Sequence, residues 1–443
     1  MAISRTTEAR QGKIADRETR ANQSRADVHR RAVRNRRGLN SRVAVLTAGR
    51  DRHYALGLAF ALIDAGIRFD YVGSQLVDSP ELHATPLVRV LSLREQQPGA
   101  GLVAKVVRII RYYARLMRYA VTTDAAVFHI LWNNKIELFD RTLLMLYYKA
   151  LGKKLVFTAH NVNAGTRDDS DSAWNRLTLR AQYHLLDHIF VHTSTMKREL
   201  HLEFGVKPEK VTVIPYGINN AIPQTSLSCG EAKKRLGLKQ DDKAILFYGN
   251  IAPYKGLEYL ISTFSQLSTD DPSYRLIIAG NPKWSADYWL KIAEMIKQSG
   301  LEDRIMRRIE HIPDVDTELY FKAADVLVLP YTVIFQSGVL ILSFSLGLPV
   351  IATNVGELKQ QVEQADAGLS CETCSSVALA NAIRRYFGSD LFLNLEYHRD
   401  RIRKYANEQY SWTKVVELTS EVYARLLGHC ENHSRDGRTV VVR

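Results

Sequence analysis

Residues 43–73 read VAVLTAGRDRHYALGLAFALIDAGIRFDYVG and carry the clearest structural signal of the chain. The apolar run 43–46 predicts a buried strand that ends in a turn at Thr47-Ala48-Gly49. Apolar residues at helical spacing follow up to Gly66, and 69–73 predicts a second strand. Strand, helix and strand at this spacing are typical of a β-α-β unit in a parallel sheet.

The same alternation continues on both sides of a polar stretch at 224–230. The predicted strands are 125–130, 155–158, 188–191 and 211–214 before it, and 244–248, 275–279, 326–329 and 349–353 after it. We therefore expect two successive doubly wound α/β domains, with a cleft at the carboxyl ends of their strands, where such sheets bind ligands. We assign the domains to 42–220 and 221–405, followed by a helix at 406–428 that crosses back to the first domain.

The chain has 443 residues and a formal net charge of +13, which favours an anionic partner. Residues 1–40 contain eleven Lys and Arg against four Asp and Glu, so this segment supplies +7 of the excess. It has almost no bulky apolar residues, and we predict a disordered basic arm at 1–41 and a polar tail at 429–443. The net charge is the sole argument for nucleic-acid binding, because the sequence contains no recognisable nucleic-acid-binding module. We therefore expect no nucleic-acid partner.

Targeting and redox signals indicate a cytoplasmic protein. No apolar run approaches the roughly 20 residues needed to span a bilayer, and no secretory signal is evident. The four cysteines are too few and too scattered for a disulfide framework. Cys371 and Cys374 form a lone C-x-x-C without two further ligands at a matching spacing, so no metal site is predicted.

The segment Tyr248-Gly249-Asn250-Ile251-Ala252-Pro253-Tyr254-Lys255-Gly256 leads from a predicted strand into a helix. Backbone N–H groups at a helix start, together with a lysine ammonium, make a phosphate-binding site. The spacing of a Walker loop is absent. Gly249, Asn250, Lys255 and Gly256 are therefore candidate ligands of a phosphorylated substrate.

Two further segments carry candidate site residues. Gln336-Ser337-Gly338-Val339 opens a predicted helix, where a diphosphate could meet backbone N–H groups and the helix dipole. An ordinary strand–turn–helix connection explains the same pattern equally well. His160 follows the strand at 155–158, at the edge where α/β domains place function. A structural histidine and a ligand-binding histidine both fit this position.

In this order, the segments resemble the retaining GT-B glycosyltransferases of family 4. The shared motifs lie at 156–161, 213–218, 249–256, 324–331 and 347–353, and the likeness extends over 42–428. The resemblance implies the GT-B fold, two Rossmann-like domains facing across a cleft. It also implies transfer of a hexosyl group from a nucleoside-diphosphate sugar to a polysaccharide or lipid-linked oligosaccharide, in envelope or exopolysaccharide synthesis.

The resemblance implies a role for each candidate residue. Lys255 would pair with the donor diphosphate, and the backbone of Ser337, Gly338 and Val339 would cradle it, with Gln336 as a further donor-binding residue. His160 would contact the transferred sugar from the first domain, whose glycine turn contains Gly49. The segment with His311 and Ile312 would face the nucleotide base. No metal or other cofactor is needed, because cationic side chains and helix dipoles stabilise the leaving diphosphate.

The sequence departs from the family pattern at informative positions. The two glutamates that the family places near the donor sugar and ribose correspond to Ile334 and Leu342, and an arginine of the lysine loop corresponds to Asn250. The retaining outcome is therefore left open. A non-catalytic sugar-nucleotide-binding protein on the same fold is the alternative function.

A predicted helix at 102–120 bears on the acceptor. It carries Lys105, Arg108, Arg111, Arg115 and Arg118 along one face, with apolar residues largely on another. A basic amphipathic helix can rest on an anionic membrane, and we expect peripheral contact with the inner face of the plasma membrane. A solvated face of a core helix is the equally ranked alternative.

Overall fold

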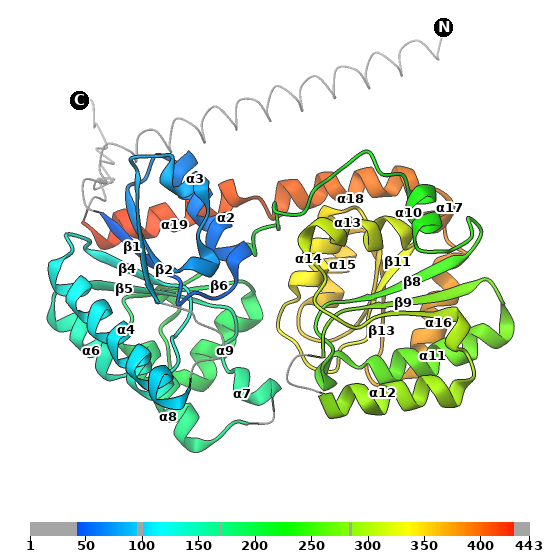
Figure 1. Ribbon diagram of the computed structural model, residues 1–443, viewed down its shortest axis with the longest axis horizontal. Helices are drawn as coiled ribbons and strands as arrows, with labels where there is room; N and C mark the ends of the chain where they lie inside the picture. The colour runs from blue at the N-terminus through cyan, green and yellow to red at the C-terminus, as the bar shows by residue number, and fades with distance from the viewer. Residues whose placement is uncertain (1–41, 95–100, 169, 283–285, 429–443) are drawn as a thin grey trace, which may run out of the picture.

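The computed structural model describes residues 42–94, 101–168, 170–282 and 286–428. Two α/β domains lie side by side, each built on a parallel sheet with helices on its faces (Figure 1). The first sheet has the order β3-β2-β1-β4-β5-β6-β7, and the second has the order β10-β9-β8-β11-β12-β13. This arrangement confirms the predicted GT-B architecture of two Rossmann-like domains. The expected basic arm and polar tail lie outside the described residues.

The first domain contains β1 (Val43–Leu46), α2 (Arg52–Asp64), β2 (Phe69–Ser74), α3 (Pro80–His83), β3 (Val88–Arg94), α4 (Leu102–Thr122), β4 (Val127–Ile130), α5 (Glu137–Arg141), α6 (Leu143–Ala150), β5 (Lys154–Ala159), α7 (Ala164–Arg167), α8 (Ala173–Leu185), β6 (His188–Val191), α9 (Ser194–Phe204) and β7 (Val211–Val213). Its central strands β1, β4 and β6 are buried along their whole length, because helices cover both faces of the sheet.

The second domain contains α10 (Cys229–Arg235), β8 (Lys243–Tyr248), the 3₁₀ turn η3 (Pro253–Lys255), α11 (Leu257–Asp270), β9 (Tyr274–Ala279), α12 (Ala286–Ser299), β10 (Ile305–Arg308), α13 (Asp314–Ala323), β11 (Val326–Leu329), α14 (Gly338–Ser345), β12 (Val350–Thr353), α15 (Leu358–Ala365), β13 (Gly368–Cys371), α16 (Ser376–Phe387), α17 (Asp390–Leu393) and α18 (Leu395–Gln409). The last helix, α19 (Trp412–Leu426), returns to the first domain.

The predicted return of the chain is confirmed, although a break interrupts the helix expected at 406–428. The chain leaves α18 at Gln409 and enters α19 at Trp412, with the Ser411 side chain capping the new helix. Figure 1 shows α18 along the second domain and α19 along the first, where α19 packs on α2. The Trp412 indole donates a hydrogen bond to the carbonyl of Ile218 at 2.8 Å. This contact joins α19 to the segment that connects the domains.

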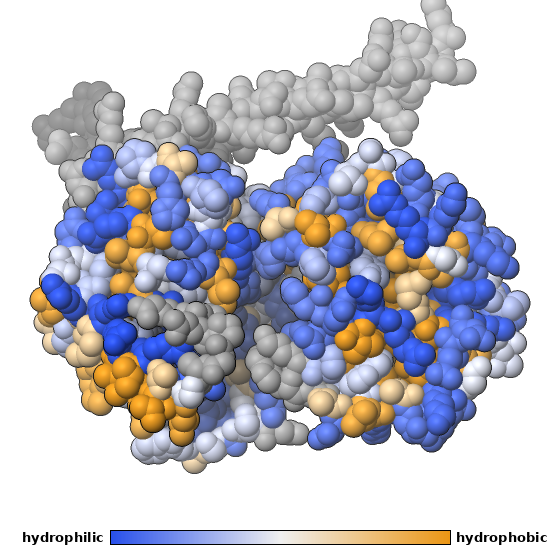
Figure 2. All heavy atoms as spheres, in the orientation of Figure 1, coloured by the Kyte–Doolittle hydropathy of each residue, from blue (hydrophilic) through white to orange (hydrophobic). Residues whose placement is uncertain are grey.

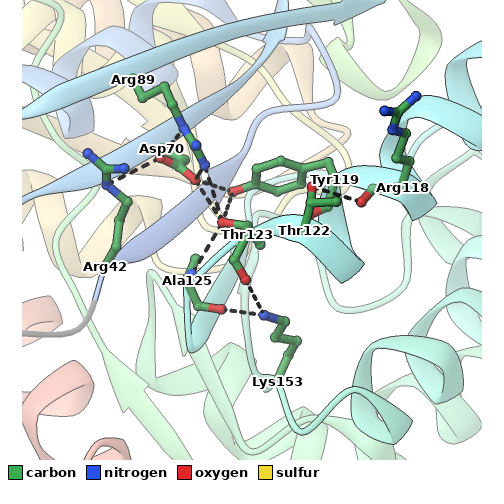
Figure 3. A network of polar contacts seen from close by, with 9 residues as sticks. All are labelled: Arg42, Asp70, Arg89, Arg118, Tyr119, Thr122, Thr123, Ala125 and Lys153. Carbon is green, nitrogen blue, oxygen red and sulfur yellow. Dashed lines mark hydrogen bonds and ion pairs between the residues drawn. The ribbon is translucent and has the colours of Figure 1, made fainter.

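The helix α4 is fixed to the first sheet through the buried carboxylate of Asp70 (Figure 3). Tyr119 donates its hydroxyl hydrogen to Asp70 at 2.7 Å, and Thr123 donates at 3.0 Å. Arg89 and Arg42 supply the opposite charge, with the Arg89 Nε bonded at 3.0 Å. Because a buried carboxylate needs such partners, this network ties the C-terminal end of α4 to β2 and β3.

Neither a metal centre nor a membrane span is found in the described parts of the chain. Among these residues, no group of three or more His, Cys, Asp and Glu side chains is arranged to hold a metal ion. Within the same ranges, no helix has both the length and the apolar character needed to cross a bilayer. In the C-x-x-C pair, Cys371 is half-buried at the end of β13 and Cys374 is exposed.

Candidate functional site

A cavity of about 570 Å³ lies between the two domains, and Figure 2 shows a hollow at this place. The ends of β5 and β7 and the start of α2 contribute its wall on the first domain. The loop after β8, the loop before α13 and the start of α14 contribute the opposite wall. The cavity therefore lies at the carboxyl ends of both sheets, where the sequence predicts a ligand site.

The loop after β8 places a lysine against the second domain's wall. Gly249 has a φ of 97°, and Gly256 has a φ of 62° between η3 and α11, both in the region that favours glycine. Any side chain at Gly256 would collide with the carbonyl oxygen of Pro330, because a Cβ there would lie 2.1 Å away. This tight turn buries Lys255 and holds its Nζ 5.3 Å from the ring centre of Tyr331. Burial lowers the pKa of Lys255.

The start of α14 lies beside this lysine loop. The Ser337 hydroxyl caps the helix by accepting a hydrogen bond from the Leu340 N–H at 3.2 Å. Both amide atoms of the Gln336 side chain are buried without a protein partner, and so is the hydroxyl oxygen of Tyr331. Buried polar atoms normally have partners, so the Gln336 amide keeps unused hydrogen-bonding capacity at the start of α14.

His160 belongs to an aromatic wall on the first domain. Its ring stacks on Trp132 with centroids 4.5 Å apart and meets the edge of Tyr54 at 4.6 Å. Its Nδ1 lies 3.2 Å from Nε2 of His192, whose own Nδ1 lies 3.3 Å from the carbonyl oxygen of Ile214. Burial is the main reason that the pKa of each histidine is lowered, in the case of His192 to about 4.

These contacts fix the tautomer of His160. A carbonyl only accepts hydrogen bonds, so Nδ1 of neutral His192 carries the hydrogen and its Nε2 is an acceptor. His160 must then donate through Nδ1, which leaves its Nε2 as an acceptor. That Nε2 is buried and has no protein partner. The lone pair of His160 Nε2 therefore has no donor among the described protein groups.

Most of the predicted site residues line this one cavity: His160, Gly249, Asn250, Lys255, His311, Ile312, Gln336, Ser337, Gly338 and Val339. Two predicted residues, Gly49 and Gly256, are not part of its lining. Both have positive φ and shape turns, Gly49 at the exit of β1 with a φ of 66°. Ile334 and Leu342 do line the cavity, so apolar side chains occupy the positions of the two family glutamates.

Several residues that line the cavity were not predicted from the sequence, including Tyr54, Trp132 and Arg167. Arg167 closes the short helix α7, and its guanidinium lies 4.9 Å from the ring centre of Tyr254 in the second domain. Trp132 follows β4, so its place after a strand was an available signal. Arg167 had no such signal, because α7 lies within a polar loop between β5 and α8.

Two further polar contacts bridge the domains near the cavity. The Glu357 carboxylate accepts hydrogen bonds from the Ser194 hydroxyl at 3.1 Å and from the Thr195 N–H at 2.9 Å, at the start of α9. On another side, His53 Nε2 lies 3.3 Å from the Asp314 carboxylate. The two walls are therefore held facing each other.

Comparison with protein families gives matches to both halves of the chain. Residues 52–221 match the family described as Glycosyltransferase Family 4, and residues 230–409 match the family described as Glycosyl transferases group 1. The chain belongs to the group 1 glycosyltransferases. As a glycosyltransferase of this group, it has the activity class and the GT-B fold that the resemblance implied.

Curated relatives of this glycosyltransferase include D-inositol 3-phosphate glycosyltransferases. That of Corynebacterium glutamicum is 26% identical over 298 residues, which cover 64% of this chain and 69% of the relative. That of Acidothermus cellulolyticus is 28% identical over 242 residues, covering 54% and 53%. The match thus spans between about half and two thirds of the length of these relatives.

Solved structures of similar fold include a sucrose-phosphate synthase from Thermosynechococcus elongatus, with a TM-score of 0.70 and 19% identity over 88% of this chain and 100% of that one. HepE from Anabaena, solved in complex with UDP-glucose, gives a TM-score of 0.67 at 16% identity and covers 87% and 100%. At these identities the likeness shows the shared fold of the glycosyltransferase.

Proposed function

We propose that this group 1 glycosyltransferase moves a hexosyl group from a nucleoside-diphosphate sugar to a polysaccharide or lipid-linked oligosaccharide. In the reaction, the bond between the sugar C1 and the diphosphate oxygen breaks, and a bond from C1 to an acceptor hydroxyl oxygen forms. The hydroxyl proton is released and the nucleoside diphosphate leaves. The observation that carries the proposal is one cavity in which Lys255 and the start of α14 face His160.

Each wall of the cavity has a separate task. Lys255 and the backbone N–H groups at the start of α14 bind the diphosphate and stabilise the charge that develops as it leaves. This set of groups acts without a metal ion or other cofactor. The Nε2 of His160 accepts a hydrogen bond from a hydroxyl of the transferred sugar and holds the donor in reactive geometry. Structures of HepE with UDP and with UDP-glucose support a donor of this class.

The apolar residues Ile334 and Leu342 give the second candidate function its support. Neither side chain can accept a hydrogen bond from a sugar or ribose hydroxyl, and both line the cavity. A protein that binds sugar nucleotides without transfer would fit these two substitutions. We favour transfer, with retention of configuration as the likeness to family 4 implies, because the positioning groups of both walls are present.

Binding of donor parts tests the proposal. Calorimetric titration with UDP, GDP and ADP, and with a panel of their sugar conjugates, should give saturable binding for one nucleotide class. Incubation of the bound sugar nucleotide with an acceptor extract should release the free nucleoside diphosphate. If the protein binds a sugar nucleotide but releases no nucleoside diphosphate with any acceptor, the result would favour the non-catalytic alternative. If it binds none of the nucleotides, both proposed functions would be refuted.

We also propose that the acceptor is reached at an anionic membrane surface, on the cytoplasmic face. The first two turns of α4 are exposed to solvent, and Leu102, Val103, Val106 and Ile110 are exposed apolar side chains of this helix. The helical spacing places Lys105, Arg108, Arg111, Arg115 and Arg118 on a different arc of the same helix. Apolar side chains gather on this part of the first domain (Figure 2). An apolar face flanked by positive charge suits a helix lying in the membrane interface.

Burial differs between the two halves of α4. On the predicted apolar face, Tyr113 and Leu116 are buried, whereas Val106 and Ile110 are 48% and 63% exposed. The helix therefore faces the core only through its C-terminal half, where Asp70 anchors it. The exposed apolar side chains favour membrane contact over a simple solvated face.

A further inference from the structure

The proposed diphosphate site on the second domain, formed by Lys255 and the start of α14, contains little positive charge. Asn250 occupies the position where the family resemblance implies an arginine, which leaves Lys255 as the cation of that loop. A nucleoside diphosphate that leaves a sugar carries more negative charge than one ammonium neutralises. In the described residues that line the cavity, the lysine and arginine side chains are Lys255 and Arg167.

Arg167 reaches the lysine loop from the opposite domain. Its guanidinium lies 4.9 Å from the ring centre of Tyr254, and Tyr254 directly precedes Lys255 in η3. The two cations are close enough to interact: burial lowers the pKa of Lys255 most, and the charge of Arg167 lowers it further. A diphosphate bound between them would relieve this repulsion.

The helix that carries Arg167 is capped and bonded to its neighbour α8. The Asn163 side chain is fully buried and accepts a hydrogen bond from the Gly165 N–H at 3.1 Å. The same oxygen accepts from the Asn175 side chain of α8 at 3.0 Å. These bonds join the start of α7 to α8, on the side of the cavity where Arg167 lies.

The guanidinium retains hydrogen-bonding capacity after its protein contacts. Arg167 donates from Nε and Nη2 to the two carboxylate oxygens of Asp168, at 2.7 and 2.8 Å. This pairing uses two of the five N–H groups and fixes the plane of the guanidinium. The other N–H groups remain available for phosphate oxygens, and the ring of Tyr254 supports the cation from one face.

We propose that Arg167 binds the donor diphosphate from the first domain, opposite Lys255, and replaces the arginine that Asn250 does not supply. This assignment rests on the proposed function, since it presumes a nucleoside-diphosphate donor. The diphosphate site is then complete only when both domains face each other across the cavity. Arg167 therefore contributes to donor affinity and to stabilisation of the leaving group.

The test compares Arg167→Ala and Arg167→Lys with Arg176→Ala as the matched control. Arg176 is an exposed arginine of the same domain, bonded to Asp171 outside the cavity. The ligands are whichever of UDP, GDP and ADP the parent binds most tightly, its monophosphate and its nucleoside. Thermal unfolding confirms that each variant is folded.

We expect Arg167→Ala to weaken diphosphate binding roughly 10- to 100-fold, the usual range for loss of a charge-assisted hydrogen bond, and to leave nucleoside binding within twofold. Arg167→Lys should recover part of the affinity, and Arg176→Ala should match the parent. Diphosphate binding by folded Arg167→Ala within twofold of the parent would overturn the assignment, as would an equal loss for the nucleoside. Failure of the parent to bind any of the three diphosphates would instead refute the proposed function.

Discussion

His160 and His192 form a pair in which each proton has a defined place. Nδ1 of His192 donates to the Ile214 carbonyl, and Nδ1 of His160 donates to His192, so the acceptor Nε2 of His160 remains for a ligand. The stack on Trp132 fixes the plane of this ring. A residue held in this way positions a substrate without exchanging a proton with it.

Replacing His160 by alanine should slow transfer about 100-fold, because misplacement of the donor sugar by about 1 Å has an effect of this size. Binding of the bare nucleoside diphosphate should change little, since that ligand lacks the sugar. Steady-state kinetics and calorimetry measure the two effects, with the exposed His184→Ala on α8 as the control. Parallel loss of transfer and diphosphate binding would instead assign His160 to the fold or to the diphosphate.

Lys255 differs from His160 because it acts on the charge of the leaving group. Lys255→Ala should slow transfer by raising its activation free energy about 2–4 kcal/mol, the range seen for other pre-positioned charge donors. The variant should remain folded, because Gly249 and Gly256 define the turn. Initial-rate assays at saturating donor measure the effect. Turnover near that of the parent in a folded variant would contradict the assignment.

The sequence could predict those site residues that follow a strand or open a helix. His160, Lys255 and Ser337 all lie at such positions. Arg167 could not be found in this way, because its contact with Tyr254 joins two domains and depends on their relative placement. The exposure of Ile334 and Leu342 to the cavity was anticipated only through the resemblance.

At the level of elements, the sequence predicted the interior strands and the edge strand β7, and missed the other three edge strands. The strands β3, β10 and β13 are terminal in their sheets and contain no continuous buried run. Continuous apolar runs identify strands that are buried on both faces. The three partly exposed edge strands lack a continuous buried run and were therefore not predicted. The helix α4 was predicted correctly, but the exposure of its first half depends on tertiary packing, which the sequence pattern does not report.

Changing Arg108, Arg111 and Arg115 of α4 together to glutamate should release the protein from anionic liposomes. Each basic residue near such a surface contributes about 1 kcal/mol of attraction. A matched triple change of Lys291, Lys297 and Arg385, exposed in the second domain, should leave sedimentation with liposomes unchanged. Both proteins are also compared without residues 1–40, because that basic segment could supply the same attraction. Equal sedimentation of the α4 variant and the parent would show that α4 is a solvated face.

In the whole molecule, α19 links the two domains: it follows the second domain in the chain and packs against the first domain, where it contacts the sheet. His129 of β4 lies fully buried with Nδ1 2.6 Å from the Tyr423 hydroxyl on α19 and Nε2 2.7 Å from the Thr158 hydroxyl. Burial lowers the pKa of His129 to about 3, and it lowers the pKa of His188 to about 4. The contact between α19 and the sheet therefore requires neutral histidines.

Acid should destabilise the fold through these histidines. An unfolded histidine takes up a proton near pH 6.5, whereas the buried ones do so only near pH 3 to 4. The unfolded state thus binds more protons between these values, and stability falls as the pH drops below 6.5. Each such histidine should lower the free energy of unfolding by about 2 kcal/mol between pH 7 and 5. Urea unfolding measures this change, and a His188→Gln variant should lose less than the parent. Equal stability of the parent at pH 7 and 5 would contradict the prediction.

The proposed reaction transfers a sugar from a nucleoside-diphosphate donor to an acceptor in the cavity between the domains. Its most direct test supplies the purified protein with radiolabelled sugar nucleotides of the UDP, GDP and ADP classes and with membranes or polysaccharide as acceptor. We expect one donor to yield labelled acceptor and an equal amount of free nucleoside diphosphate, and we expect Lys255→Ala and His160→Ala to abolish most of both. A parent protein that binds a donor yet labels no acceptor, or variants that transfer as fast as the parent, would contradict the proposal.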